Sequence, residues 1–184
     1  QPSCAWRPDA LRDLLHKRLS TPPPPTLFLG ESNDEYMVEH ICKQCGGANR
    51  TRLVSSDPDS TACDCNGWKL AVFKHVGVSR APPYWLSVED PKSERHRQGV
   101  PLAFDMLIPV LASNFEATLG SRAQVVVAHS GSWDSARACQ MRYALPSFVP
   151  DWTANATSFV AALRREFPSV WWRAPNGLVP PITK

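Results

Sequence analysis

The stretch LFLGESND, residues 27–34, decides the fold that this sequence predicts. Its first three residues are apolar and form a short run of the kind that is buried as a strand, and Gly30 follows that run. Residues 34–42 then have apolar side chains at helical spacing. The stretch therefore predicts a buried strand that leads through a tight turn into a helix.

The rest of the chain repeats this pattern. Further strands are expected at 69–76, 125–128 and 169–173, and further helices at 6–19, 102–118 and 153–166. Alternating strands and helices predict an α/β fold with a parallel sheet and helices on both faces. We expect one domain, 1–184, built as a three-layer α/β/α sandwich of flavodoxin-like type. Because the chain stops soon after the fourth strand, we expect the fold to be truncated at its C-terminus.

Two segments differ from this framework. Residues 1–25 combine the first helix with a connector, Pro22–Pro25, that is stiff because proline favours polyproline II. Residues 43–67 are polar and rich in Cys, Asp, Ser, Asn and Gly. We interpret them as a surface excursion stapled by disulfides.

Composition and charge exclude several classes of function. The hydrophobic fraction of 43% is ordinary for a globular protein. The formal net charge is +3, and the basic residues are scattered rather than gathered in the stripe that nucleic-acid binding requires. The sequence has no apolar run of the roughly 18 residues that mark a membrane-spanning helix. We expect no nucleic-acid partner, no membrane span in this chain and no cofactor.

The cysteines indicate the cellular compartment. Their number is even, which favours three disulfides in an oxidising compartment, and they are Cys4, Cys42, Cys45, Cys63, Cys65 and Cys139. We expect the middle four to tie the 43–67 excursion to the preceding helix, and the outer two to pair. The alternative is a four-thiolate zinc site, because Cys-x2-Cys followed by Cys-x-Cys approximates that spacing. We favour the disulfides, and no metal.

Two glycosylation sequons agree with this compartment. They begin at Asn49 and Asn155, each followed by Thr two residues later. Together with the cysteines they predict a secreted or cell-surface protein.

The ends of the predicted strands carry polar residues. Ligands of parallel α/β sheets collect at the carboxyl ends of the strands, which here are residues 30–34, 77–79 and 129–134. Ser32 lies on a strand-to-helix turn, near helix N-terminal N–H groups that can stabilise an oxyanion. The structural alternative is that Ser32 or Asn33 caps the helix.

Three short segments resemble one family of enzymes. LFLGES at 27–32 looks like the first block of the SGNH (GDSL) hydrolases. VVVAHSGSWD at 125–134 resembles the N-S-G-x-W-D segment of the PC-esterase branch, and WWRAP at 171–175 is similar to its later W-R-x-x-P strand. That branch includes acyl esterases and polysaccharide O-acetyltransferases of cell surfaces. The order and rough spacing of the three segments agree with the family over residues 4–175.

The resemblance implies roles for individual residues. Ser32 would be the nucleophile, and its backbone N–H, with that of Gly77, would line the oxyanion hole. His129 occupies the position of the family's third donor, an Asn, and a neutral imidazole can still donate one hydrogen bond. Glu31 replaces the usual Asp. No Asp-x-x-His motif follows Arg173, so the family's catalytic base is missing from this chain, and serine without a base is a poor nucleophile.

Other histidines and the tryptophans are assigned mainly to structure. A rewired pair, with His129 as base and Asp134 as its orienting partner, is an alternative for the missing base. His75 is interpreted as a packed core residue, and His16, His40 and His96 as helix-surface or loop residues. Trp133, Trp171 and Trp172 are expected to fill the core, whereas the loop residue Trp85 packs or, alternatively, stacks on a sugar ring.

Two functional hypotheses follow. The first is a degenerate or incomplete PC-esterase-like extracellular domain, with a structural or glycan-contacting role in a cell-surface assembly. The second is a serine esterase or O-acyltransferase that acts on cell-surface carbohydrate and is completed by an Asp-x-x-His segment outside this chain. The partners are accordingly other subunits of an extracellular assembly, or a glycan.

Overall fold

A mixed sheet of five strands forms the centre of the molecule. The computed structural model describes residues 22–45, 51–53, 60–75, 77–78, 104–130, 134 and 145–173. The strand order is β2-β3-β1-β4-β5, with β1 Thr26–Gly30, β2 Ser60–Cys65, β3 Trp68–Lys74, β4 Val125–His129 and β5 Ser169–Arg173. The four strands expected from the sequence are present and parallel. The α/β class is therefore confirmed.

The edge strand β2 corrects the sequence interpretation of residues 43–67. Ser60–Cys65 is largely buried and pairs antiparallel with β3, so this part of the segment is not a surface excursion. Cys65 pairs with Trp68, and the two residues between them, Asn66 and Gly67, have φ of 53° and 90°. Positive φ at both positions is typical of the two-residue type I′ turn that Asn-Gly favours.

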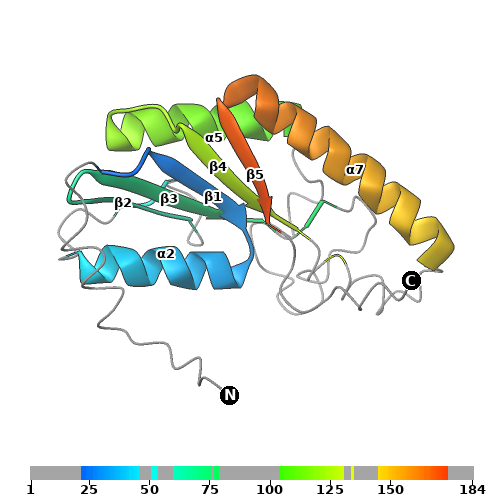
Figure 1. The fold of residues 1–184 in the computed structure, drawn as a ribbon, viewed down its shortest axis with the longest axis horizontal. Coiled ribbons are helices and arrows are strands. Elements are labelled where there is room, and N and C mark those ends of the chain that lie inside the picture. Colours follow the sequence, from blue (N-terminus) through cyan, green and yellow to red (C-terminus); the bar gives the residue numbers. More distant parts are fainter. Residues whose placement is uncertain are drawn as a thin grey trace, which may run out of the picture.

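Helices cover both faces of the sheet (Figure 1). α2, Ser32–Gln44, lies on one face, and α5, Phe104–Leu119, and α7, Leu145–Glu166, lie on the other. The sequence predicted α2 and α5 closely, but α7 begins at Leu145 rather than at 153 and continues through Pro150. Within the described residues, no helix has the length and apolarity needed to cross a membrane.

Each face has its own apolar core. The larger core joins the α5 and α7 face to the sheet, and its fully buried side chains include Leu27, Leu29, Val126, Ile108, Leu111, Phe115 and Leu163. The smaller core packs Val38 and Ile41 of α2 on Leu70 and Val72 of β3. Alternate residues of β1 and β3 supply the two cores, as strand geometry requires, whereas β4 and β5 contribute to the larger core.

Two disulfides reinforce the smaller core. Cys42 bonds Cys63 and Cys45 bonds Cys65, which ties the C-terminal end of α2 to β2. The predicted tie between the helix and the segment after it is confirmed. The zinc alternative is wrong for these four residues because their sulfurs are bonded to one another. Disulfides are typical of oxidising compartments.

Several predictions fall on residues outside the described ranges, namely those for Cys4, Cys139, Asn49, His16, His96, Trp85, Trp133, the helix at 6–19 and the residues after Arg173.

The two tryptophans of β5 differ from one another. Trp172 packs against the larger core, as predicted, but Trp171 is 65% exposed, so its assignment to the core is wrong. The two side chains point to opposite faces because side chains alternate along a strand. On the face of Trp171, α2 packs against the other half of the sheet, on β2, β3 and β1 (Figure 1).

Candidate functional site

β1 and β4 are neighbouring parallel strands at which the connections change from one face of the sheet to the other. α2, which follows β1, lies on one face of the sheet, and α7, the next helix after β4 whose bounds are described, lies on the other (Figure 1). Chains that leave adjacent parallel strands in opposite directions leave room for a ligand at the carboxyl ends of those strands. The residues that follow β1 and end β4 and β5 are therefore the candidates for function.

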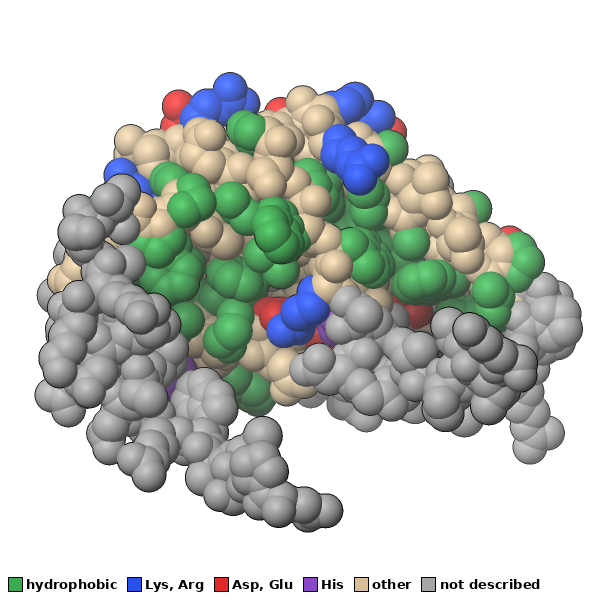
Figure 2. Space-filling model, in the orientation of Figure 1, with side chains coloured by type: hydrophobic (Ala, Val, Ile, Leu, Met, Phe, Trp, Pro, Cys, Tyr) green, Lys and Arg blue, Asp and Glu red, His purple; other side chains and the backbone are tan. Residues whose placement is uncertain are grey.

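Four ionisable side chains meet at this edge. Glu31 and Asp34 come from the turn after β1 and the first turn of α2, whereas His129 ends β4 and Arg173 ends β5. Glu31, Asp34 and His129 are each at least nine-tenths buried, and the Arg173 side chain is 34% exposed. On the face shown in Figure 2, basic, acidic and histidine side chains meet at one place beside a hydrophobic surface.

Local structure explains how the two carboxylates reach this position. Glu31 is the N-cap of α2, and it forms a reciprocal capping box with Asp34. Asp34 Oδ2 accepts a hydrogen bond from the backbone N–H of Glu31 at 3.3 Å. A Cβ on Gly30 would lie 1.9 Å from that same oxygen, so only glycine allows the carboxylate this close to the strand. The expectation that Ser32 or Asn33 caps the helix is wrong, because the cap is Glu31.

The ion contacts centre on Asp34. Arg173 Nη2 lies 2.7 Å from Asp34 Oδ1. His129 Nδ1 lies 3.8 Å from Asp34 Oδ2 and 3.9 Å from Glu31 Oε2, too far for a hydrogen bond. His129 Nδ1 and Arg173 Nε are buried atoms that form no hydrogen bond with a described group. The cluster is thus paired in charge but incompletely hydrogen-bonded.

Burial governs the protonation of His129. Removal from water lowers the pKa of the imidazole below its usual value, and the Arg173 charge and His75 also lower it. The Glu31 and Asp34 carboxylates oppose this effect by favouring the imidazolium. The net direction is downward, so His129 is neutral at neutral pH. That state agrees with the predicted role of the imidazole as a hydrogen-bond donor.

Ser32 lies beside this cluster. It is the first residue of α2 and is half-buried. The first-turn N–H groups of the helix are close to its hydroxyl by virtue of chain position, and the positive end of the helix dipole favours an anion there. The structure therefore brings Ser32 and His129 to the same edge of the sheet, as the sequence predicted.

The backbone N–H of Gly77, another predicted oxyanion donor, is engaged by His75. His75 Nε2 lies 3.3 Å from the Leu29 carbonyl oxygen, so this nitrogen carries the ring hydrogen and donates. Nδ1 is then the acceptor, and it receives the backbone N–H of Gly77 at 3.3 Å. The His75 ring also packs on Phe159 at 5.4 Å. These contacts agree with the interpretation of His75 as a packed residue, and the oxyanion role of Gly77 stays a prediction.

Asp134 is the centre of a second buried network. Its Oδ2 accepts hydrogen bonds from Val78 N at 3.1 Å, from Trp152 Nε1 at 2.9 Å and from Ser130 Oγ. Asp134 is fully buried and packs against Gly77, where a Cβ would lie 2.3 Å from Oδ1. These bonds tie the segments after β3 and β4 to α7. The carboxylates within 4 Å of His129 are those of Glu31 and Asp34, rather than that of Asp134, the partner proposed from the sequence.

Sequence reasoning missed Asp34 and Arg173 as members of the site. The signal for Arg173 was its place at the end of the fourth predicted strand, the edge where parallel sheets gather functional groups. Asp34 carried no comparable signal, because an acidic residue in the first turn of a helix is ordinary.

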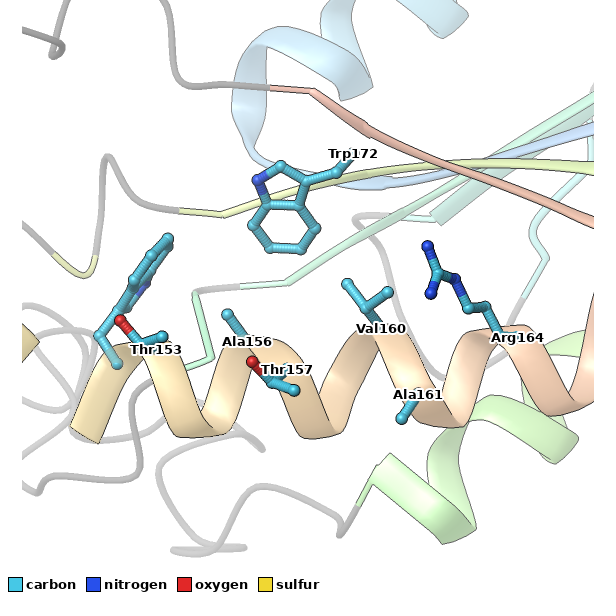
Figure 3. A pocket seen from close by; sticks show the side chains of 8 residues that line it. Thr153, Ala156, Thr157, Val160, Ala161, Arg164 and Trp172 are labelled. Atoms are coloured by element: carbon cyan, nitrogen blue, oxygen red, sulfur yellow. The ribbon is translucent and has the colours of Figure 1, made fainter. Parts of the chain in front are cut away.

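A groove of 390 Å³ lies between α7 and β5 (Figure 3). Its lining residues are Trp152, Thr153, Ala156, Thr157, Val160, Ala161, Arg164 and Trp172. The sequon residue Asn155 is half-buried within α7, in a helix rather than in the surface loop that is usual for glycosylation.

Comparison of the chain with family models, with curated proteins and with solved structures finds no match. The functional argument consequently depends on the side chains themselves.

Proposed function

We propose that this chain is an extracellular domain of SGNH type, a three-layer α/β/α sandwich of the PC-esterase-like branch, in which the strand-end site contacts a cell-surface glycan without hydrolysing it. The observation that carries the proposal is how the charged side chains around His129 are paired. Its Nδ1 faces the carboxylates of Glu31 and Asp34, and Asp34 is paired with Arg173. The ionisable groups at this edge are thus engaged with one another.

This arrangement suits binding. A neutral buried imidazole and a partly exposed guanidinium are hydrogen-bond donors, and carboxylates are acceptors. Sugar hydroxyls, and the carbonyl oxygens of acyl esters on sugars, pair with groups of both kinds. Catalysis would need in addition a base that takes the proton of the Ser32 hydroxyl.

The alternative is a serine esterase or O-acyltransferase on cell-surface carbohydrate. The half-buried position of Ser32 at the first residue of α2 favours it. In that mechanism Ser32 Oγ attacks the acyl carbonyl, its proton passes to a histidine of an Asp-x-x-His segment outside this chain, and the sugar oxygen leaves with that proton. Backbone N–H groups and His129 would stabilise the oxyanion.

A fluorophosphonate probe labels only activated serines, and it tests the choice when it is applied to the natural protein that carries this chain, because the alternative places the activating histidine outside the chain. We expect wild-type protein to label no more than Ser32→Ala, with Ser158→Ala, an exposed serine on α7, as the matched control. We expect an O-acetylated oligosaccharide to shift the backbone amide NMR signals of Ser32, Asp34 and His129. Labelling that Ser32→Ala removes and Ser158→Ala retains would establish the esterase instead, and unchanged NMR signals would reject glycan contact.

A further inference from the structure

The groove between α7 and β5 is large enough to hold a ligand. Its volume of 390 Å³ lies within the range of about 300–1,000 Å³ that is typical of such sites. In Figure 3, the ring of Trp172 stands over α7, and side chains from successive turns of the helix, Ala156 and Val160 among them, point toward it. The groove is therefore open to solvent and mostly apolar, with an aromatic wall.

The aromatic wall is held in place. The Trp172 ring packs edge-on to Trp152 and Phe159, with ring centroids 6.3 and 6.5 Å apart. Trp152 is fixed in turn by the hydrogen bond from its Nε1 to Asp134. A tryptophan whose position is set by its neighbours offers a large contact area at little cost in conformational entropy. Such a face suits the flat, apolar side of a sugar ring.

Arg164 gives the groove its charge. It lies toward one end of the groove and is exposed. The next residue, Arg165, pairs with Asp105, whereas no described acidic side chain lies within ion-pairing distance of Arg164. A planar guanidinium binds a carboxylate through two parallel hydrogen bonds. A ligand that matches this groove therefore has a ring to pack on Trp172 and a carboxylate to pair with Arg164.

The other end of the groove approaches the strand-end site. Trp152 lines the groove and bonds Asp134, which packs against Gly77 at the carboxyl edge of the sheet. A ligand that lies along α7 therefore has one end near the Asp134 network.

We propose that this groove binds an acidic oligosaccharide, with a sugar ring on Trp172 and the carboxylate of a uronic acid on Arg164. The inference rests on the proposed function, since it names the class of glycan that the proposed extracellular domain would contact.

Calorimetric titration of the full chain with a tetramer of galacturonic acid tests the proposal, with a neutral tetrasaccharide for comparison. We expect the acidic tetramer to bind and the neutral one to bind at least tenfold more weakly. Arg164→Gln should weaken binding of the acidic tetramer by about tenfold, as loss of a charged hydrogen bond does. Arg165→Gln is the matched control and should bind as wild type does.

Two further variants test the aromatic wall. Trp172→Ala should abolish binding, and Trp171→Ala, on the opposite face of the same strand, should leave it unchanged. Because Trp172 contacts the core, Thr157→Trp provides a second test: Thr157 is exposed, so an indole there fills the groove from the solvent side. This variant should also abolish binding while the far-UV circular dichroism stays that of wild type.

Several results would overturn the proposal. They are equal binding by the Arg164 and Arg165 variants, equal binding of acidic and neutral tetramers, or no binding of the acidic tetramer at millimolar concentration. Self-association through the groove, seen as a dimer in sedimentation that Thr157→Trp abolishes, would assign the groove to a second copy of the chain. Binding of the acidic tetramer in the groove without a shift in the amide NMR signals of Ser32, Asp34 and His129 would mean failure at the strand-end site alone, so failure at that site and failure in the groove are distinguishable.

Discussion

Asp34 and Asp134 are two buried aspartates at the same edge of the sheet. Their positions are similar, but the groups that surround them are different. They are 2% and 0% exposed. Each packs against a glycine at the end of a strand, where a Cβ would lie 1.9 Å from an oxygen of Asp34 and 2.3 Å from one of Asp134. In both cases a small residue makes room for a buried charge.

The partners that the structure describes for the two aspartates differ in kind. Asp134 receives hydrogen bonds from a backbone N–H, a hydroxyl and an indole, all of which are neutral. Asp34 faces the ionisable side chains of Arg173 and His129, and buried atoms of both those partners form no hydrogen bond with a described group. Satisfied buried networks make a structure rigid, whereas partly satisfied ones have capacity for a ligand. We therefore assign Asp134 to structure and Asp34 to the candidate site.

The largest effect should come from the glycine beside Asp134. Gly77 has φ of +99° and would direct a Cβ at the buried carboxylate. Gly77→Ala should therefore lower the free energy of unfolding by about 4 kcal/mol, the sum of backbone strain and overpacking. Urea denaturation measures this. Gly120→Ala is the control, because Gly120 has φ of +67° but the nearest atom lies 3.9 Å from its Cβ position, so this variant should lose only about 1 kcal/mol. Equal losses in the two variants would show that Asp134 does not confine Gly77.

The second test compares the aspartates directly. Asp134→Ala leaves buried donors from Val78, Ser130 and Trp152 unpaired, so it should cost about 3 kcal/mol in the free energy of unfolding. Asp34→Ala should cost less, about 1–2 kcal/mol, because its ionic partner Arg173 is 34% exposed and regains water. Chemical denaturation of both variants at pH 7 gives the comparison. A larger loss for Asp34→Ala would reverse the assignment of the two networks.

The sequence predicted the parallel strands of the sheet better than the edge strand β2. The parallel strands were predictable because buried apolar runs such as Leu27–Leu29 need no partner to be recognised. β2 was not, since Ser60–Cys65 is small and polar and is buried through its hairpin and its disulfides. The Asn66-Gly67 turn was the available signal for that hairpin. Trp171 was misassigned because periodicity does not reveal which face of an edge strand a helix covers.

The site was predictable only in part, for a related reason. Ser32 and His129 were found because each follows a predicted strand. The roles of Glu31 as N-cap and Asp34 as ionic centre depend on distances across the turn, which spacing alone does not give. The contact between Arg173 and Asp34 depends on the strand order, in which only β4 separates β5 from β1. The sequence did not predict that order.

The smallest expected effect concerns the protonation of His129. The pH dependence of stability tests whether His129 belongs with Asp34 or with Asp134. The folded-state pKa of His129 is lowered, first by burial, with Glu31 and Asp34 opposing and Arg173 and His75 assisting. Below the unfolded pKa of about 6.5, the unfolded chain takes up a proton that the folded protein does not. Stability is therefore full above that pH and falls as the pH decreases toward the folded pKa, by about 1.4 kcal/mol for each unit of lowering.

His129→Gln should flatten this decline, which denaturation between pH 5 and 8 measures. Arg173→Gln should raise the pKa of His129, because it removes a positive charge, and NMR titration of the ring detects the change with exposed His40 as internal reference. Asp134→Asn should move the titration of His129 much less, since the ions that face the imidazole are Glu31, Asp34 and Arg173. If Asp134→Asn shifted the His129 titration as far as Arg173→Gln does, the two aspartates would belong to one electrostatic unit, and their separation into structural and functional networks would fail.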